Sequence, residues 1–533
     1  MEFFKLACTV FTTALYFAAA WLSQRRFIHM FQLNSYKPKV QLKWLKDNAR
    51  GFFAGHIAGA IISLICAVLS AGLTTSSVGQ GLLTIPISAV LLFSAICLRP
   101  EPAKIPLKYT ARIKRLIFTL CIIYLLPAIV LFALYDWGFT VVFAAAYTLW
   151  VLLSPYAVLL ANVINRPVEQ AINRHYINDA KRILKDCPNL TVIGITGSFG
   201  KTSVKYFLDE LLSVKYNVLK TPGNFNTPLG VVKTVRGELR ATHDIFLCEM
   251  GAKNVGDIEE ICDIVHPKHG IITSVGPMHL ESFGSIENVR KTKFELADAL
   301  PEDGFLWLNT DSENVREGAK GRRFIGYGIN SREGYYVDDL CMSASGSEFD
   351  VVSPSGERCR FKTKLIGAHN ALNICGAAAV ANTLGIPLEQ LKPAVRRLES
   401  VPHRLELKNS GDATIIDDAY NSNPSGAAAA LETLKQMDGF RILCTPGMIE
   451  LGEKQYKLNF ELGEKAAECC DFAVAVGKTN SEAIISGLKS GGFGEEKIFA
   501  AESLNEAVKK IYSLTTDGKR KIILLENDLP DNY

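Results

Sequence analysis

A run of glycine, lysine and hydroxyl-bearing residues near position 200 has the composition of a phosphate-binding turn. Glycines let backbone N–H groups curl around phosphate oxygens, a lysine can reach the transferable phosphate, and a following threonine can ligate magnesium. The run consists of Thr196, Gly197, Ser198, Phe199, Gly200, Lys201, Thr202 and Ser203. We expect it to bind ATP, with Lys201 at the reacting phosphate and Thr202 on Mg²⁺.

The residues on either side of this run supply the strand and the helix that such a turn requires. Residues 190–195 read LTVIGI, a short β-branched run typical of a buried strand, and residues 204–212 have helical spacing. The N-terminus of that helix adds positive potential at the phosphate. A strict version of the motif would have glycine where Ile195 stands, so the sequence follows the narrower pattern T-G-x-x-G-K-[ST].

This turn resembles that of the Mur ligases, ATP-dependent enzymes that add amino acids or D-alanyl-D-alanine to peptidoglycan precursors. Nine further blocks follow in the order of that family. They begin at Gly223, Glu249, His279, Lys291, Asn309, Gly367, His403, Asp417 and Gly447. The blocks D-D-A-Y-N-S-N-P and G-M-I-E-L-G look most like the branch that adds D-alanyl-D-alanine to a muramoyl tripeptide. The resemblance covers about residues 165–533.

The resemblance implies that the γ-phosphate of ATP moves onto a carboxylate and that an amine then displaces it from the acyl phosphate. Two anions must meet, so positive charge is the first requirement. The implied catalytic residues are Lys201, His279, Lys293 and Arg404. The implied metal ligands are Thr202, Glu249, His279 and Lys293. Lys293 would act as a ligand after carbamylation; the alternative is that it is a surface cation on a helix, like Lys291.

Nucleoside and substrate contacts also follow from the resemblance. Those expected at ATP, besides the turn, are Asn370, Asn373, Arg404 and Asp418. Those expected at the acceptor or the amino substrate are Asn224, Tyr420, Asn421 and Asn423. Amides suit adenine because they offer a donor and an acceptor together. Asn370 could instead cap the helix that follows it, and residues 421–424 could form a turn that caps another helix.

Two α/β domains are expected to carry these residues. Residues 190–398 would form the central P-loop ATPase domain, and residues 399–533 a smaller Rossmann-like domain with a doubly wound sheet. Strands of the smaller domain are expected at 413–416, 441–445, 472–476, 497–499 and 522–525, alternating with helices such as 426–436 and 458–470. Closure of this domain would exclude water from the acyl phosphate.

The N-terminal third is far more apolar than the rest of the chain. Five stretches, each near the ~20 residues that cross a bilayer as a helix, carry no charge at their centres. They are 3–22, 52–73, 81–98, 116–135 and 139–164. Lysine and arginine gather in alternate loops, which by the positive-inside rule places residue 165 in the cytoplasm. We expect an all-α membrane bundle over 1–164, with the bilayer as a partner and a multi-pass location in the cell membrane.

Residues 165–189 would form a linker helix, lying either on the inner leaflet or against the catalytic domain. The membrane stretch stands where soluble Mur ligases have a UDP-binding domain. A lipid-linked cell-envelope acceptor is therefore an alternative to the muramoyl tripeptide. A nucleotide-switched sensor or transporter is a second alternative, but the stretches lack an ionisable relay. The net charge of +4 over 533 residues argues against a nucleic-acid partner.

Overall fold

The computed structural model describes residues 2–48, 106–134, 153–343, 346–400, 403–419 and 423–528, together with single positions between 61 and 149. The chain divides into two compact units, one formed mainly by Met1–Arg174 and the other by His175–Leu529. Each unit has its own apolar core, so each is described by itself.

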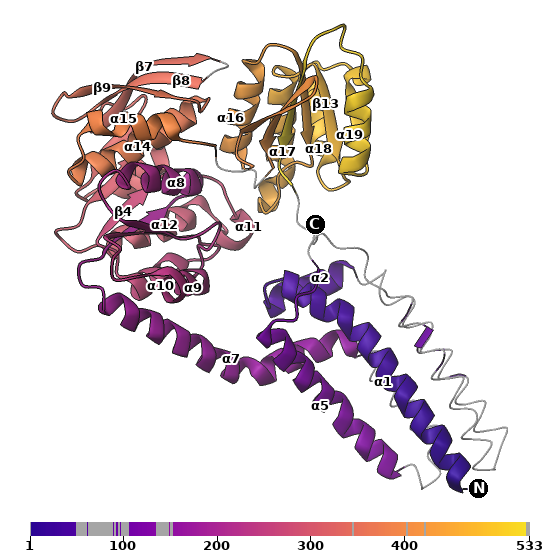
Figure 1. Cartoon of the computed structure of the whole chain (residues 1–533). Helices are drawn as coiled ribbons and strands as arrows, with labels where there is room; N and C mark the ends of the chain where they lie inside the picture. Colours follow the sequence, from indigo (N-terminus) through magenta and orange to yellow (C-terminus); the bar gives the residue numbers. More distant parts are fainter. Residues whose placement is uncertain are drawn as a thin grey trace. The chain divides into compact units, whose positions relative to one another are not determined.

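Helices alone make up the described part of the first unit (Figure 1). They are α1 (Glu2–Leu33), α2 (Pro38–Asp47), α5 (Ala111–Leu134) and the first part of α7 (Ser154–Lys185). Apolar side chains from all four helices form one cluster, which includes Phe27, Phe31, Leu45, Leu116 and Val158. Burial of these side chains is what holds the short α2 against its longer neighbours.

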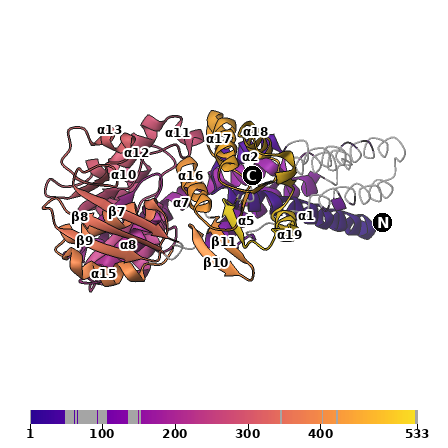
Figure 2. The same ribbon diagram turned by 90° about the horizontal axis from the view of Figure 1, so that it is seen from above.

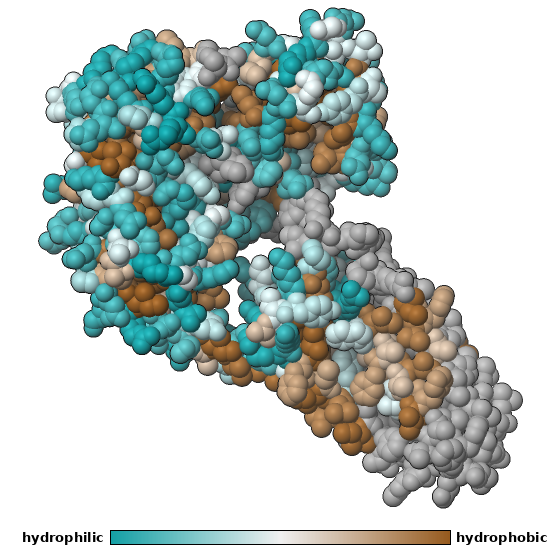
Figure 3. All heavy atoms as spheres, in the orientation of Figure 1, coloured by the Kyte–Doolittle hydropathy of each residue, from teal (hydrophilic) through white to brown (hydrophobic). Residues whose placement is uncertain are grey.

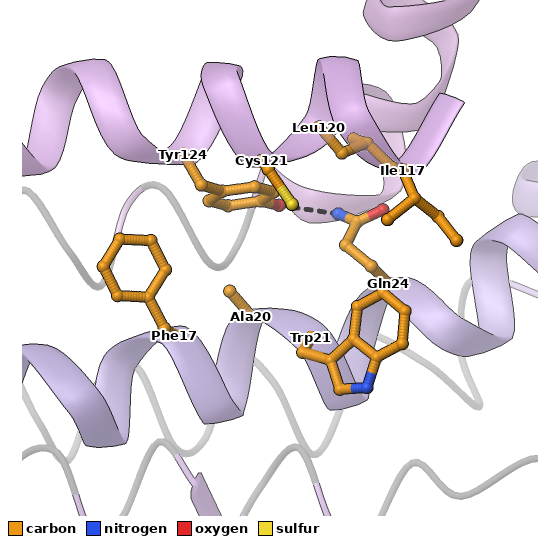
Figure 4. Close-up of a pocket in the computed structure, with 8 residues that line it drawn as sticks. All are labelled: Phe17, Ala20, Trp21, Gln24, Ile117, Leu120, Cys121 and Tyr124. Carbon is orange, nitrogen blue, oxygen red and sulfur yellow. Dashed lines mark hydrogen bonds between the residues drawn. The ribbon is translucent and has the colours of Figure 1, made fainter. Parts of the chain in front are cut away.

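Polar side chains also pair inside this unit. Gln24 of α1 donates to the hydroxyl of Tyr124 on α5 at 2.6 Å and to the carbonyl of Ser154 at 2.7 Å. Arg115 makes a two-pronged contact with Glu169, at 2.7 and 2.9 Å. A small cavity of about 60 Å³ lies beside Gln24, between Phe17 and Trp21 of α1 and the facing side chains of α5 (Figure 4). Hydrogen bonds and an ion pair thus connect α1 to α5 and both of these helices to α7.

The predicted membrane location is contradicted. Crossing a bilayer core takes about 20 consecutive apolar residues. Within the residues that the structure describes, no helix is both long enough and apolar enough to do so. Most of the predicted stretches 52–73 and 81–98, and most of the first half of 139–164, lie outside the described residues. The membrane bundle, the bilayer partner and the multi-pass topology therefore receive no support, although apolar side chains such as Phe118 and Leu125 are exposed on α5. Brown, apolar surface covers much of the described part of the first unit in the view of Figure 3.

A nine-stranded sheet forms the centre of the first half of the second unit. Its strands are β1 (Thr191–Thr196), β2 (Val218–Lys220), β3 (Ile245–Glu249), β4 (His269–Ile272), β5 (Leu306–Asn309), β6 (Ile325–Gly328), β7 (Tyr335–Ser343), β8 (Gly346–Val352) and β9 (Arg358–Thr363). They lie in the order β2-β3-β1-β4-β5-β6-β7-β8-β9. After β1 the chain forms β3 and β2 on one side of that strand and then crosses to β4 on the other side. The strand order therefore reverses at β1, and ligands of such sheets bind at the carboxyl end of the strand where this happens.

Helices cover both faces of this sheet (Figure 1). One face packs against α8 (Lys201–Leu212), α14 (Ala368–Thr383) and α15 (Leu388–Arg397). The other face packs against α9 (Pro228–Glu238), α10 (Asp257–Val265), α12 (Ile286–Asp298) and α13 (Glu313–Ala319). Strands β1, β3 and β4 are buried almost throughout, as expected for parallel strands covered on both faces.

The last three strands of this sheet, β7, β8 and β9, are antiparallel to one another (Figure 2). In β9, charged Arg358, Arg360 and Lys362 alternate with more buried Cys359 and Phe361. The three cations pair with acidic side chains of β7 and β8, among them Asp350 and Glu348. The expectation of a simple central ATPase fold did not include this antiparallel extension.

A six-stranded sheet forms the second half of this unit. Its strands are β10 (Glu406–Ser410), β11 (Ala413–Asp418), β12 (Phe440–Thr445), β13 (Phe472–Val476), β14 (Ile498–Ala501) and β15 (Lys521–Glu526). The order is β10-β11-β15-β12-β13-β14, parallel except for β10. Helices α16 (Pro424–Lys435), α17 (Gln455–Ala467), α18 (Ser481–Ser490) and α19 (Leu504–Ser513) accompany it. The five expected strands are confirmed, and β10 was not expected.

The second part of α7 belongs to the larger unit. Ile177, Ala180 and Leu184 pack against the core beneath α9 and α10. Asp179 pairs with Arg236 of α9 at 2.7 Å, and the Arg236 guanidinium lies over the ring of Tyr176. Of the two alternatives for this linker helix, the structure therefore shows packing on the catalytic domain.

Candidate active site

The phosphate-binding turn connects β1 to α8 and lies between the loops that follow β3 and β4. The hydroxyl of Thr196 donates to the carbonyl of Met250 after β3 at 3.0 Å. The Ser198 hydroxyl accepts from the N–H of Gly276 at 3.0 Å, and the N–H of Phe199 donates to the Ser274 hydroxyl at 2.7 Å. Hydrogen bonds to the loops on both sides therefore hold the turn in place.

Two glycines of the turn allow a close approach that a larger residue would prevent. A Cβ atom on Gly197 would lie 2.1 Å from the hydroxyl oxygen of Thr273, with the backbone at φ +151°. A Cβ on Gly200, at φ +83°, would lie 3.0 Å from the side-chain oxygen of Asn373. Glycine adopts such backbone conformations without the penalty that a side chain imposes. The turn can therefore present its backbone N–H groups directly to an anion.

Lys201 lies folded back over this turn. Its ammonium donates to the carbonyl of Gly197 at 2.7 Å and to that of Ser198 at 3.2 Å. Burial lowers the pKa of Lys201 to about 8, and Arg404 adds to this effect while Glu249 opposes it. The cation thus occupies the concave side of the turn, where a phosphate group would find it.

Glu249 is the centre of a buried cluster at the end of β3. The hydroxyl of Thr202 donates to its Oε1 at 3.1 Å, and the amide of Asn226 donates to the same oxygen at 3.2 Å. The ammonium of Lys205 lies 2.9 Å from Oε2. Burial alone would raise the pKa of Glu249, but Lys205 and Lys201 outweigh it and hold the pKa below its ordinary value. The carboxylate is therefore ionised.

The donors in this cluster suit magnesium. Mg²⁺ prefers oxygen ligands and is usually held by one or two carboxylates together with phosphate oxygens and water. Thr202 and Glu249, the residues that the resemblance implies as metal ligands, supply a hydroxyl and an ionised carboxylate beside the turn. When bound, the ion would neutralise negative charge that develops during transfer of the phosphate.

His279 stands in the loop that follows β4, with a left-handed backbone at φ +52°, directly before the short helix α11 (Leu280–Phe283). Its Nδ1 contacts the carboxylate of Glu450, which also pairs with Lys253 at 2.8 Å. Burial lowers the pKa of His279 although Glu450 opposes this, so the neutral ring is favoured. With Nδ1 held by Glu450, Nε2 is the nitrogen left for a metal.

Lys293 lies on α12 and is 3% exposed, whereas Lys291, two positions earlier, is exposed. Burial lowers the pKa of Lys293 to about 7, and nearby Lys201 contributes in the same direction. The structure therefore contradicts the alternative in which Lys293 is a surface cation. The helix turns one lysine towards solvent and the other into the protein.

The two predicted nucleoside amides lie on the first turns of α14. Asn373 is 9% exposed and its oxygen faces Gly200 of the phosphate-binding turn. Asn370 donates to the carbonyl of Ile366 at 2.9 Å. Gly367 occupies the capping position of this helix, so the alternative role of Asn370 as the cap is wrong. Asn373 is thus beside the turn and Asn370 one helical turn away.

Arg404 and Asp418 come from the six-stranded half of the unit. The charge of Arg404 contributes to lowering the pKa of both Lys201 and Lys205, which places this guanidinium near the phosphate-binding turn. Asp418 ends β11 and accepts from the N–H of Leu405 at 3.2 Å. Burial raises the pKa of Asp418 to about 7. A backbone contact therefore connects the loop of Arg404 to this carboxyl group.

Three of the remaining predicted residues lie in the described part of the chain. Asn423 caps α16 by accepting from the N–H of Gly426 at 2.9 Å, as the alternative interpretation of its block expected. Asn224 is exposed and Ser203 is half-buried on α8. Tyr420 and Asn421 lie outside the described residues.

Three residues of the cluster were not predicted, namely Lys205, Asn226 and Glu450. Lys205 follows Lys201 by four positions in α8, so both lysines lie on the same face of that helix, whereas the expected helix began only at residue 204. Asn226 and Glu450 stand inside blocks that the resemblance had already marked. Their partners come from distant positions in the chain, which is why the sequence did not distinguish them from their neighbours.

Comparison with known proteins agrees with this geometry. The family model described as "Mur ligase middle domain" matches residues 195–381, and that described as "Mur ligase, glutamate ligase domain" matches residues 403–525. The UDP-N-acetylmuramoyl-tripeptide–D-alanyl-D-alanine ligase of Escherichia coli (strain K12) is 30% identical over 344 residues, which are 63% of this chain and 75% of that protein.

Solved structures give the same result. MurF from Acinetobacter baumannii has a TM-score of 0.60 and 26% identity, covering 67% of this chain and 77% of its own. The MurF ligase from Thermotoga maritima in complex with ADP has a TM-score of 0.60 and 25% identity, covering 67% of this chain and 80% of its own. The chain therefore belongs to the Mur ligase family and is an ATP-dependent acid–amino-acid ligase that uses Mg²⁺.

Proposed function

We propose that this ligase adds D-alanyl-D-alanine to a UDP-N-acetylmuramoyl tripeptide, a precursor of the cell wall. The proposal is supported by the relatives named above, which are ligases of that substrate pair or MurF structures. The blocks at Asp417 and Gly447 also follow that branch. The alternatives of a lipid-linked acceptor and of a nucleotide-switched sensor have no such support.

The observation that carries the proposal is the cluster at the carboxyl ends of β1 and β3. Lys201 would contact the γ-phosphate, and Thr202 with Glu249 would hold one Mg²⁺. His279 and a carbamylated Lys293 would hold a second ion. Arg404 would neutralise phosphate charge, Asn373 would contact adenine and Asp418 the ribose. Asn224, Tyr420 and Asn421 remain the candidates for the acceptor and the amine.

We also propose a division into a central domain over 190–398 and a C-terminal domain over 399–533. Two observations support it. The two family matches fall within these ranges, and the nine-stranded and six-stranded sheets do so as well. The acyl phosphate would form on the central domain and meet the amine that the C-terminal domain presents.

The decisive experiment measures ADP release by the full-length chain with UDP-muramoyl tripeptide, D-alanyl-D-alanine and MgATP. We expect saturable turnover that needs both the acceptor and the dipeptide. Lys201→Ala should reduce kcat/KM by at least about 100-fold, the effect of removing one group that stabilises transition-state charge. Exposed Lys215, which bonds the carbonyl of Gly385, provides the control, and Lys215→Ala should retain activity.

Other substrates decide between this proposal and its alternatives. Replacing the dipeptide by single amino acids, or the acceptor by the same muramoyl tripeptide without UDP, should abolish most of the ADP release. Turnover that prefers either replacement would show that the substrate pair is wrong while the ligase chemistry stands.

A further inference from the structure

Lys205 is a buried cation at the active site for which neither the family blocks nor the proposed function has a role. It lies on α8, one helical turn after Lys201, and its side chain is 0% exposed. Its ammonium lies 2.9 Å from Oε2 of Glu249 and donates to the carbonyl of Gly223 at 2.7 Å. Both partners belong to segments that flank the phosphate-binding turn.

The fold alone does not explain a cation at this position. Lysine is almost never fully buried unless it is paired. Desolvation of two charges can cost more than their attraction returns, and apolar replacements of a buried ion pair are often neutral or stabilising. The surroundings of α8 are apolar, with Val204, Leu208 and Leu211 fully buried. A hydrophobic residue at position 205 would pack in these apolar surroundings without the cost of burying a charge. We therefore attribute the charge of Lys205 to a role in the active site.

The contacts divide the carboxylate of Glu249 between two sets of partners. Oε2 faces Lys205, while Oε1 receives the hydroxyl of Thr202 and the amide of Asn226. An oxygen held by a lysine that is itself fixed to a backbone carbonyl cannot rotate freely. The other oxygen is therefore kept beside Thr202, the second oxygen donor proposed for Mg²⁺.

The second contact of Lys205 reaches the loop 222–227 that joins β2 to α9. Gly223 in this loop has a left-handed backbone at φ +49°, and a Cβ atom at this position would meet no other atom within 4 Å. Packing around Gly223 therefore does not fix the position of the loop. Asn226 of the same loop bonds Glu249 and also accepts, through its carbonyl, the N–H of Gly251 at 2.7 Å. Lys205 thus joins the loop that carries Asn224 to the carboxylate at the end of β3.

We propose that Lys205 is a positioning residue that orients Glu249 for Mg²⁺ and fixes the loop 222–227 beside it. The inference rests on the proposed role of Glu249 and Thr202 as magnesium ligands. The opposite possibility is that the ammonium occupies the cation site and competes with Mg²⁺. The two ideas predict opposite changes in Mg²⁺ affinity when the charge of Lys205 is removed. Mg²⁺ should bind more weakly if Lys205 orients Glu249, and more tightly if the ammonium competes with the ion.

The test titrates MgCl₂ into the full-length chain with a fixed concentration of ADP and records ADP binding by calorimetry. Lys205→Gln keeps a donor for Gly223 and removes the charge. Groups that orient a metal-ligating carboxylate typically contribute 10- to 100-fold in metal affinity. We therefore expect the Mg²⁺ concentration for half-maximal enhancement of ADP binding to rise by about 10-fold or more, with ADP affinity in the absence of Mg²⁺ changed by less than about 3-fold.

Lys205→Arg and Lys215→Gln complete the series. Arginine keeps the charge but displaces it, so the Mg²⁺ midpoint should rise less than in Lys205→Gln. Lys215 is exposed beyond the end of α8, and its glutamine variant should match the wild-type midpoint. If Lys205→Gln does not fold, Lys205→Arg decides, because an unchanged midpoint in that variant overturns the positioning role. A lowered midpoint in either variant establishes competition instead.

Glu249→Gln separates this inference from the proposed function on which it rests. If Glu249→Gln raises the Mg²⁺ midpoint and Lys205→Gln does not, the positioning role is refuted and the magnesium assignment stands. If neither substitution changes the midpoint, the magnesium assignment itself fails.

Discussion

The two lysines of α12, Lys291 and Lys293, differ in a way that determines their chemistry. Lys293 is buried, and burial lowers its pKa to about 7, whereas Lys291 faces solvent. A neutral amine can attack carbon dioxide, forming an N–C bond and releasing one proton, which leaves a carbamate anion. Above pH 7 the neutral form of Lys293 predominates, so the proposed carbamate should form there and be lost as the pH falls.

We predict that the full-length chain incubated with ¹³C-bicarbonate shows one protein-bound carbamate signal by ¹³C NMR, growing between pH 6 and pH 8. The signal should disappear in Lys293→Arg, since the guanidinium stays charged, and persist in Lys291→Arg. A spectrum without that signal at pH 8, or one that is unchanged in Lys293→Arg, would exclude carbamylation of this residue.

Site residues that belong to a local motif could be predicted from the sequence. Site residues that are recognised only by their contacts with distant positions of the chain could not. Thr202 and Lys201 follow from the spacing of the turn, and the strand before Glu249 indicates where that carboxylate must end. The contact of Glu450 with His279 joins positions 171 apart. Nothing local marks such a pair, because its geometry depends on how two sheets and their loops are placed.

At the scale of elements, β11 and β15 end in neighbouring carboxyl groups. Asp418 and Glu526 stand opposite each other in the parallel register of the two strands. Burial raises the pKa of Glu526 to about 8, and Asp418 adds to this effect while the hydroxyl of Thr445 opposes it. The carboxyl of Glu526 is fully buried and is therefore protonated at neutral pH.

This arrangement makes stability fall as the pH rises. In the unfolded chain Glu526 ionises near its ordinary value of 4.5, so between about pH 4.5 and pH 8 the native state holds a proton that the unfolded state has released. Glu526→Gln removes that difference. Since one pKa unit corresponds to about 1.4 kcal/mol, we expect it to raise the free energy of unfolding at pH 8 by more than about 1 kcal/mol, and much less at pH 5.

Urea denaturation of the full-length chain at both pH values provides the measurement. Glu502 is exposed in the same half of the chain, and Glu502→Gln should leave the pH profile of the wild type unchanged. Equal effects of Glu526→Gln at pH 5 and pH 8 would show that the native carboxyl is not held protonated.

The elements themselves were predictable where the pattern was strong. The expected strand 472–476 coincides with β13, that at 441–445 begins one residue later than β12, and that at 522–525 is one residue shorter than β15 at each end. These strands are buried and parallel, so they are continuous apolar runs. By contrast, β10 and β9 are half-exposed and have charged residues at alternate positions. Neither strand is a continuous apolar run, so neither was recognised from the sequence.

At the scale of the whole molecule, the chain has two units with separate cores. The core of the first unit is built from α1, α2, α5 and the first part of α7. Among the residues that the structure describes, the cores of the second unit draw on positions from Ile177 onward. The second unit carries the proposed ligase site. Among the described residues, no side chain of the first unit belongs to the cores of this second unit.

We predict that a fragment of residues 165–529 folds cooperatively and binds ADP within about 3-fold of the full-length chain, a difference under about 1 kcal/mol. A shorter fragment beginning at 186 lacks Ile177, Ala180 and Leu184, which pack on the core beneath α9 and α10. Each large apolar side chain lost from a core removes about 1.5–3 kcal/mol, so the shorter fragment should unfold at a lower temperature.

Thermal unfolding by circular dichroism and calorimetry with ADP test both fragments. A longer fragment that shows no cooperative transition would mean that the second unit depends on the first for its fold. Equal melting temperatures for the two fragments would show that the packing of α7 contributes nothing to stability.

The two outer strands of the nine-stranded sheet have a consequence for behaviour at high protein concentration. An unpaired strand edge is a template on which a second chain can add a strand, and cations along an edge discourage such pairing. At one side β2 offers only three residues. At the other side β9 carries Arg358, Arg360 and Lys362, which form ion pairs with acidic side chains of β7 and β8, so an approaching copy would have to desolvate these charged groups. The alternation of charge along β9 thus protects the folded protein against edge-to-edge aggregation.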